Sequence, residues 1–223
     1  MKFKEQLLRI ISIFSGLLPI FFFMLFRARN RYGGMMVIFF YCIVSFLTDL
    51  SYDFLKRRIS NFYIYSTFTI VEYSLFALFL YLCFQEKVFK YILVFCSLLF
   101  YGIAFYTLFS KRTAGFDSLS ASLEAVFIII YSILFLYEQI KDPTVFYVFY
   151  SKNFWIIIAF FIYFSSTLFL FIYAATFTTQ EHKIYWGINF IFNILKNIFF
   201  SISFAMKKSE KPQYPMESLY PDT

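Results

Sequence analysis

The sequence is poor in charge, in histidine and in cysteine. Only 15% of its 223 residues are charged and 61% are hydrophobic, whereas a soluble domain averages about 25% charged and 45–50% apolar residues. A soluble globular protein is therefore excluded. The single histidine, His182, and the three cysteines form no CxxC motif and no Cys/His pair, so we expect no disulfide framework, no metal site and no Ser-His or Cys-His catalysis. The protein is not expected to be an enzyme.

Glycine and proline are scarce as well, with six and five copies. Few glycines argue against helix packing through glycine zippers. The net charge of +7 does not indicate a nucleic-acid partner, because the basic residues stand in short clusters between apolar blocks. Such clusters are typical of membrane–water boundaries.

Seven apolar blocks are long enough to cross a bilayer, for which about 17–25 residues are needed. They are roughly Leu7–Phe26, Met35–Leu55, Asn61–Phe84, Val88–Ser110, Ser118–Ile140, Asn153–Phe177 and Ile184–Met206. The sequence thus predicts an all-α integral membrane protein, a seven-transmembrane-helix bundle over residues 1–206, with the lipid bilayer as its surroundings. Residues 207–223 are polar and contain proline, so we expect a disordered tail. Asp117 or Ser118 is the expected N-cap of the fifth helix.

Basic residues barely distinguish the two orientations, with nine on one face and ten on the other. The Lys207-Lys208 pair opens the longest polar tail, which favours a cytoplasmic C-terminus.

The polar residues inside the blocks share one depth. All lie between the N-terminal face and the midplane, within a layer of roughly 15 Å at 1.5 Å rise per residue. Intramembrane ionisable groups usually face the bundle interior and pair with one another. We therefore expect a polar pocket open towards the N-terminal face, in which Lys196 pairs with Glu72. The candidate ligand-binding residues are Asp49, Glu72, Glu124, Ser165, Asn189, Asn193 and Lys196.

Several of these residues also have a purely architectural interpretation. A Glu–Lys bridge can hold two helices in register, and Asp49 and Glu124 can lie at the interface. Hydroxyl groups such as that of Ser165 often hydrogen-bond to their own helix. Trp155 and Trp186 fit the role of interfacial anchors.

Motifs in five blocks carry a resemblance that covers nearly the whole chain: TDLSYD, EYSLF, SLEAVF, YFSSTLF and NILKNIFF. The chain resembles small bacterial orphan membrane proteins, which are similar to the N-terminal seven-helix sensor region of some histidine kinases. The resemblance implies a sensor or receptor-like protein of the bacterial inner membrane. Signalling would then need a partner protein in trans. Together with the polar pocket expected from the shared depth of the buried charges, this predicts a protein that binds a small, apolar ligand.

A second, local resemblance lies in Val71-Glu72-Tyr73-Ser74, which looks like the counterion motif of heliorhodopsins. It implies retinal as a cofactor, with Lys196 as the Schiff-base lysine and Glu72 as its counterion. The chain departs from the heliorhodopsin pattern in two ways. The third and sixth blocks lack the tryptophans that usually sandwich retinal, and Lys196 stands in NILKN rather than among small residues. Without this second resemblance, no cofactor is expected.

Two further alternatives remain open. Asp49, Glu72 and Glu124 could serve a proton-coupled carrier or a membrane enzyme, although the inverted repeat and broken helices usual in carriers are not visible. The chain could also be a structural subunit of a larger membrane complex.

Overall fold

The computed structural model describes residues 2–31, 33–55, 58–110, 116–141, 151–174 and 176–207. Within them the chain is all-helical. The helices are α1 (Lys2–Ser15), α2 (Leu17–Leu25), α3 (Arg27–Asn30), α4 (Met35–Leu55), α5 (Asn61–Cys83), α6 (Lys87–Phe109), α7 (Ser118–Lys141), α8 (Lys152–Tyr173) and α9 (Thr179–Ala205). The tail expected to be disordered lies, apart from Lys207, outside the described residues.

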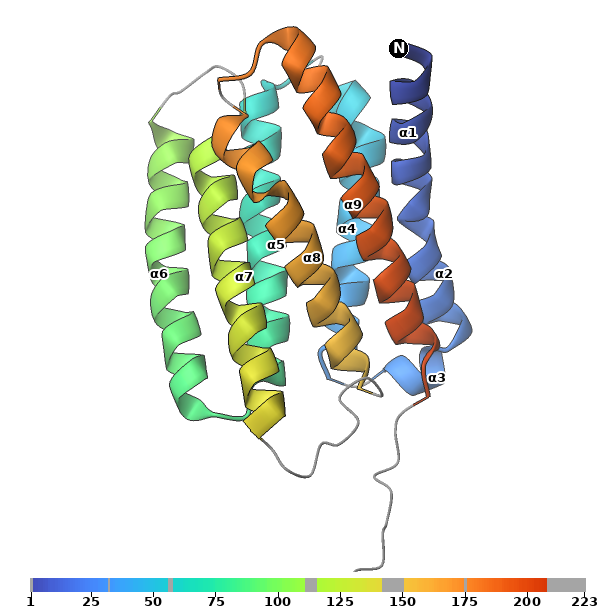
Figure 1. Cartoon of the computed structure of the whole chain (residues 1–223), viewed down its shortest axis with the longest axis vertical. Helices are drawn as coiled ribbons and strands as arrows, with labels where there is room; N and C mark the ends of the chain where they lie inside the picture. The colour runs from blue at the N-terminus through green and yellow to red at the C-terminus, as the bar shows by residue number, and fades with distance from the viewer. Residues whose placement is uncertain are drawn as a thin grey trace, which may run out of the picture.

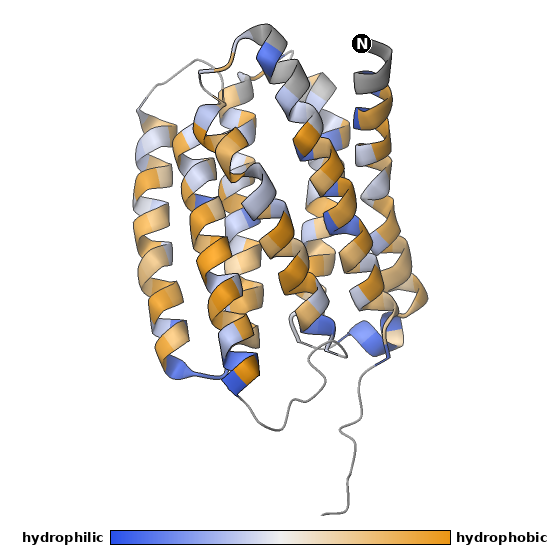
Figure 2. Cartoon of the chain, in the orientation of Figure 1, coloured by the Kyte–Doolittle hydropathy of each residue, from blue (hydrophilic) through white to orange (hydrophobic). Residues whose placement is uncertain are grey.

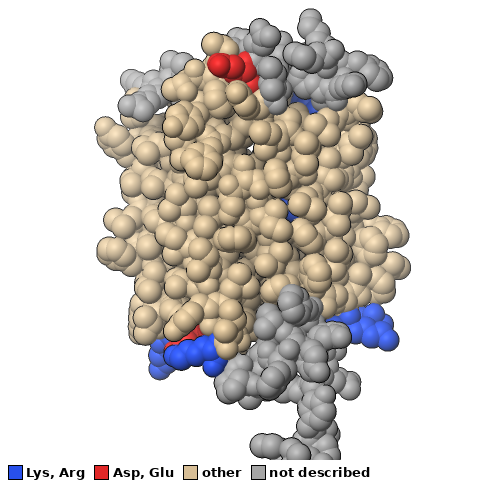
Figure 3. All heavy atoms as spheres, viewed as in Figure 1, with Lys and Arg blue, Asp and Glu red and all other residues tan. Residues whose placement is uncertain are grey.

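Seven stretches of 18–24 residues are long and apolar enough to cross a membrane, the first of them formed by α1 and α2 together. At 1.5 Å per residue they extend over about 27–36 Å, which matches the hydrocarbon core of a bilayer. Apolar residues form a broad band around the bundle (Figure 2), and charged side chains lie at its two ends (Figure 3). The predicted seven-span bundle is confirmed.

Helix α8 lies between α7 and α9 and packs most closely against these two neighbours (Figure 1). Helix α6 lies at one edge of the bundle, while α1 and α2 run along α9 at the other edge. The N-terminus and the end of α9 lie at opposite ends of the bundle, as an odd number of spans requires. The C-terminal ends of α4, α6 and α8 lie at the same end of the bundle as the N-terminus.

The first span is interrupted at Gly16, where a single continuous helix was expected. Pro19 has no N–H to donate to the carbonyl of Ser15, four residues earlier. The Gly16 N–H bonds to Ile13 O, and the Ser12 carbonyl accepts the Ser15 hydroxyl instead, at 2.6 Å. This local turn sets the two serines against α9, where Ser12 Oγ accepts a hydrogen bond from Asn193 Nδ2 and Ser15 Oγ accepts one from Asn197 Nδ2.

Buried polar caps fix both ends of the bundle. Asp117 is the N-cap of α7, as the sequence predicted: its Oδ1 accepts the Ser120 N–H at 3.2 Å. Its Oδ2 accepts the hydroxyls of Ser66 on α5 and Thr107 on α6, both at 3.1 Å. At the other end, the fully buried Asn30 donates to Phe204 O and accepts from Lys152 Nζ, which ties α3 to α8 and α9.

Candidate ligand-binding cavity

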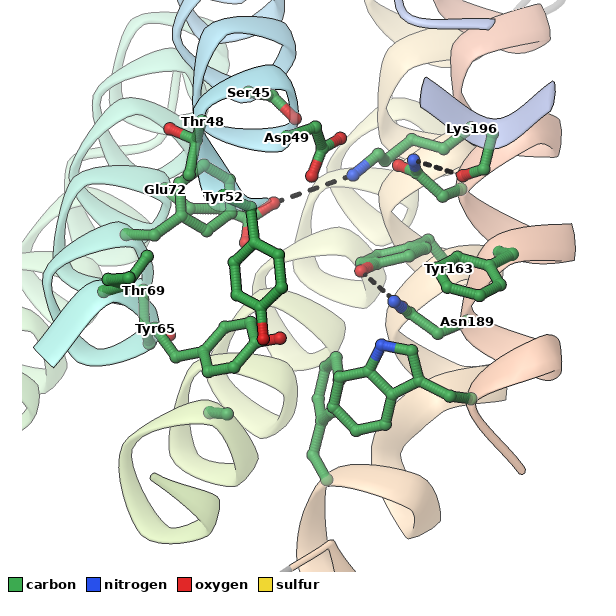
Figure 4. A pocket seen from close by; sticks show the side chains of 18 of the residues that line it. Ser45, Thr48, Asp49, Tyr52, Tyr65, Thr69, Glu72, Tyr163, Asn189 and Lys196 are labelled. Atoms are coloured by element: carbon green, nitrogen blue, oxygen red, sulfur yellow. Dashed lines mark hydrogen bonds and ion pairs between the residues drawn. The ribbon is translucent and has the colours of Figure 1, made fainter. Parts of the chain in front are cut away.

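A cavity of about 320 Å³ lies inside the bundle, in the half nearer the N-terminus. Helices α1, α4, α5, α7, α8 and α9 contribute to its wall, together with Phe116 just before α7. Neither α2 nor α6 contributes. In Figure 4, side chains from α4 and α5 face those from α8 and α9 across this space.

Each wall is one face of a helix. The α4 face consists of Tyr41, Ser45, Thr48, Asp49 and Tyr52, and the α5 face of Ile64, Tyr65, Phe68, Thr69 and Glu72. On α9 the lining residues are Trp186, Asn189, Phe190, Asn193 and Lys196. Steps of three and four residues keep side chains on one side of a helix, so the spacing of polar residues in the sequence gives rise to three polar stripes around one space.

The floor of the cavity is a four-residue cluster that we call the buried charge cluster: Tyr41, Glu72, Tyr163 and Lys196. Lys196 Nζ lies 3.6 Å from Glu72 Oε1, and the predicted ion pair is therefore present. Lys196 is 2% exposed and Glu72 is 6% exposed. Glu72 is eleven residues from the start of α5, a depth of about 16 Å.

Two tyrosines complete the buried charge cluster. Tyr41 OH donates to Glu72 Oε1 and accepts from Lys196 Nζ, each at 2.6 Å. The lysine nitrogen also lies 4.0 Å from the centre of the Tyr163 ring, within the range of a cation–π contact. Lys196 is thus surrounded by a carboxylate, a hydroxyl and an aromatic face.

Asp49 and Glu124 line the cavity nearer its mouth. Glu124 is six residues from the start of α7, which corresponds to about 9 Å of depth. It is 2% exposed, and its Oε1 has no hydrogen-bond partner. Asp49 is half-buried, and its carboxylate points towards Lys196 in Figure 4. Both residues therefore face the pocket rather than the membrane interface.

The two candidate asparagines form hydrogen bonds to side chains of neighbouring helices. Asn189 Oδ1 accepts the Tyr163 hydroxyl at 2.9 Å. Asn193 Nδ2 donates to Ser12 Oγ at 3.0 Å. Each amide side chain therefore joins α9 to a neighbouring helix while still lining the cavity.

Ser165 is the one candidate that does not line the cavity. It lies on α8 two residues from Tyr163, and residues two apart on a helix do not face the same side. The neighbouring Thr167 hydroxyl donates to the Tyr163 carbonyl at 2.8 Å. It thus bonds to the backbone of its own helix, as hydroxyl side chains in helices often do.

Aromatic side chains form the mouth of the cavity, a feature that the sequence analysis missed. This aromatic mouth consists of Tyr52, Tyr65, Phe116 and Trp186, all half-buried. Tyr65 lies 5.6 Å from Tyr52 and 5.4 Å from Phe116, and Phe116 lies 5.3 Å from Trp186, measured between ring centres. Trp186 thus packs inward over the cavity, whereas an interfacial anchor was expected.

The lining carries three carboxyl groups, of Asp49, Glu72 and Glu124, and two cations, of Arg9 and Lys196. Such a site can recognise a ligand that has both a polar head and an apolar body. Among the described residues, no cluster of three or more His, Cys, Asp or Glu could hold a metal ion. Comparisons of the chain with protein-family models, curated proteins and solved structures give no match.

Proposed function

We propose that this seven-span membrane protein is a sensor or receptor-like protein that binds a small ligand in the cavity and signals through a partner protein. The observation that carries the proposal is the cavity itself: six helices meet around one polar space. A ligand that contacts all of them can favour one arrangement of the helices over another. This is the physical requirement for transmitting a signal across a bundle.

The buried charge cluster supports the same interpretation. Burying ions is costly, and a structural contact between α5 and α9 needs none, because apolar residues of similar volume often pack as stably. In membrane spans, ionisable residues generally mark functional sites. The cluster lies directly at the floor of the cavity, where it can orient a bound ligand.

The proposal is tested by filling the cavity. Ser45 lines it, and no hydrogen bond of its side chain would be lost; Leu47, two residues along the same helix, is 53% exposed to lipid. Thermal unfolding of the purified protein in nanodiscs is measured with a panel of small amines, carboxylates and neutral apolar compounds. Stabilisation by at least one compound is expected, together with its loss in Ser45→Phe and its retention in Leu47→Phe.

Equal stabilisation of the two phenylalanine variants would show that compounds bind elsewhere, and no stabilisation by any class would argue against a ligand-binding function. Signalling through a partner is tested separately, by crosslinking the protein in its native membrane with and without the stabilising compound. A partner whose crosslinking changes with the compound is expected. An unchanged crosslinking pattern would refute signalling in trans.

A second candidate is a retinal protein, which one observation favours. Lys196 Nζ lies 3.6 Å from a carboxylate and next to a cavity lined by aromatic rings, the arrangement that a protonated Schiff base and its counterion require. The absorbance of the purified protein with all-trans-retinal tests this idea. A visible band that Lys196→Ala abolishes would support it, and the absence of a band would refute it.

A further inference from the structure

Among the buried carboxyl groups of the described residues, that of Glu124 forms no hydrogen bond and no ion pair, and its Oε1 is buried without a partner. Glu72 has Tyr41 and Lys196, and Asp117 has three donors. Glu138 accepts two backbone N–H groups on its Oε1. No lysine or arginine whose side chain the structure describes forms an ion pair with Glu124.

Burying an amide or hydroxyl group without a hydrogen-bond partner costs about 2–7 kcal/mol on transfer scales, and burying an ionised carboxylate costs more. Buried polar groups therefore nearly always have a partner. Glu124 lines the cavity, so a donor for Glu124 can come from a molecule inside the cavity. The identity of that donor follows from what surrounds it.

The surroundings favour a positive charge. The lining holds three carboxyl groups against two cations, a formal balance of one negative charge. Lys196 is already engaged by Glu72, Tyr41 and the Tyr163 ring. The aromatic mouth adds ring faces that attract cations and repel anions. Each of these features favours an ammonium group over a carboxylate or a phosphate.

The volume limits the rest of the molecule. About 320 Å³ corresponds to roughly ten water molecules at about 30 Å³ each. This space holds one ring and a short chain. The aromatic mouth gives such an apolar body a surface on which to pack.

We propose that the cavity binds a small organic ammonium compound, with its nitrogen on Glu124 and its apolar body against the aromatic mouth. This inference rests on the proposed function and names the chemical class of its ligand. The probe for testing it is phenethylamine, which is protonated at neutral pH. Its neutral counterpart, phenethyl alcohol, has the same skeleton with a hydroxyl in place of the ammonium group.

Binding of both compounds to the full-length protein in nanodiscs is measured by isothermal titration calorimetry. We expect phenethylamine to bind and Glu124→Gln to weaken its binding roughly 10- to 100-fold, the loss that follows from removing a charged hydrogen-bond partner. Glu138→Gln is the matched control, since Glu138 is also buried with an unpartnered oxygen but lies outside this cavity. It is expected to bind like the unmodified protein.

Three results would overturn the inference: no heat of binding with millimolar phenethylamine, equal binding of the alcohol, or unchanged binding in Glu124→Gln. The last is expected if Glu124 merely carries its own proton. Thermal unfolding of Glu124→Gln without ligand checks the fold. No loss of stability is expected, because the Glu124 carboxyl group forms no hydrogen bond or ion pair that the substitution could remove. If neutral or anionic compounds of the earlier panel bind and amines do not, this inference fails while the proposed function stands.

Discussion

Breaking the Glu72–Lys196 ion pair from one side should destabilise the bundle far more than removing both charges. At a separation of 3.6 Å the Coulomb attraction is about 4–5 kcal/mol for an effective dielectric constant of 20. Removing one partner leaves the other charge buried, which costs about 3–5 kcal/mol. We expect Glu72→Gln and Lys196→Met each to lower the free energy of unfolding by about this amount.

The double variant Glu72→Gln/Lys196→Met retains neither charge. The decrease in its free energy of unfolding should therefore be well below the sum of the decreases in the two single variants, with a coupling energy of about 2–3 kcal/mol. The assay is reversible unfolding in mixed micelles titrated with sodium dodecyl sulfate, followed by circular dichroism. Additive losses, with a coupling energy below about 0.5 kcal/mol, would refute the idea that the pair is formed and desolvated.

Two further predictions concern a hydroxyl group and a helix cap. Tyr41→Phe removes the hydroxyl that donates to Glu72 and accepts from Lys196. It should lower the free energy of unfolding by about 2 kcal/mol in the same assay, since hydrogen bonds to charged groups contribute about 1.5–3 kcal/mol. A change near zero would contradict the bridging role of the hydroxyl. At the start of α9, hydrogen bonds from the Thr178 backbone and side chain lower the pKa of Glu181. The capping box is therefore at full strength above the ordinary glutamate pKa and weakens as the pH falls through the lowered value. The protection factors of the amides in the first turn of α9, which are corrected for the pH dependence of the intrinsic exchange rate, should fall on acidification. Glu181→Gln should abolish that pH dependence. The same fall in protection in both proteins would be inconsistent with the capping role of Glu181.

The fold was predictable because a bilayer leaves few solutions for such a chain. Without water in the hydrocarbon core, backbone groups must bond internally, so long apolar blocks form helices. The interruption at Gly16 was less visible. Pro19 shows that the Ser15 carbonyl loses its helical donor. It does not show that the Gly16 N–H bonds to Ile13 O or that the Ser15 hydroxyl bonds to the Ser12 carbonyl.

The Glu72–Lys196 pair could be predicted because two opposite charges at one depth in a membrane have few other partners. The hydrogen-bond partners of Asn189 and Asn193 could not, because an amide side chain both donates and accepts and the choice depends on which helices are neighbours. Tyr41 and Tyr163 were missed because the chain holds 19 tyrosines and most fit an interfacial role. Tyr41 stands eight residues before Asp49, on the same helix face. This spacing could have predicted that Tyr41 lines the same cavity.

The most direct test of the cavity as a ligand site is whether water-soluble molecules enter it. Ser45→Cys and Leu47→Cys are made in a background where Cys42, Cys83 and Cys96 are alanine, and the protein in nanodiscs is treated with the cationic reagent 2-(trimethylammonium)ethyl methanethiosulfonate. Ser45 lines the cavity and Leu47 faces lipid. The account predicts rapid modification at residue 45 and none at residue 47. Protection of both cysteines in the folded protein would contradict it.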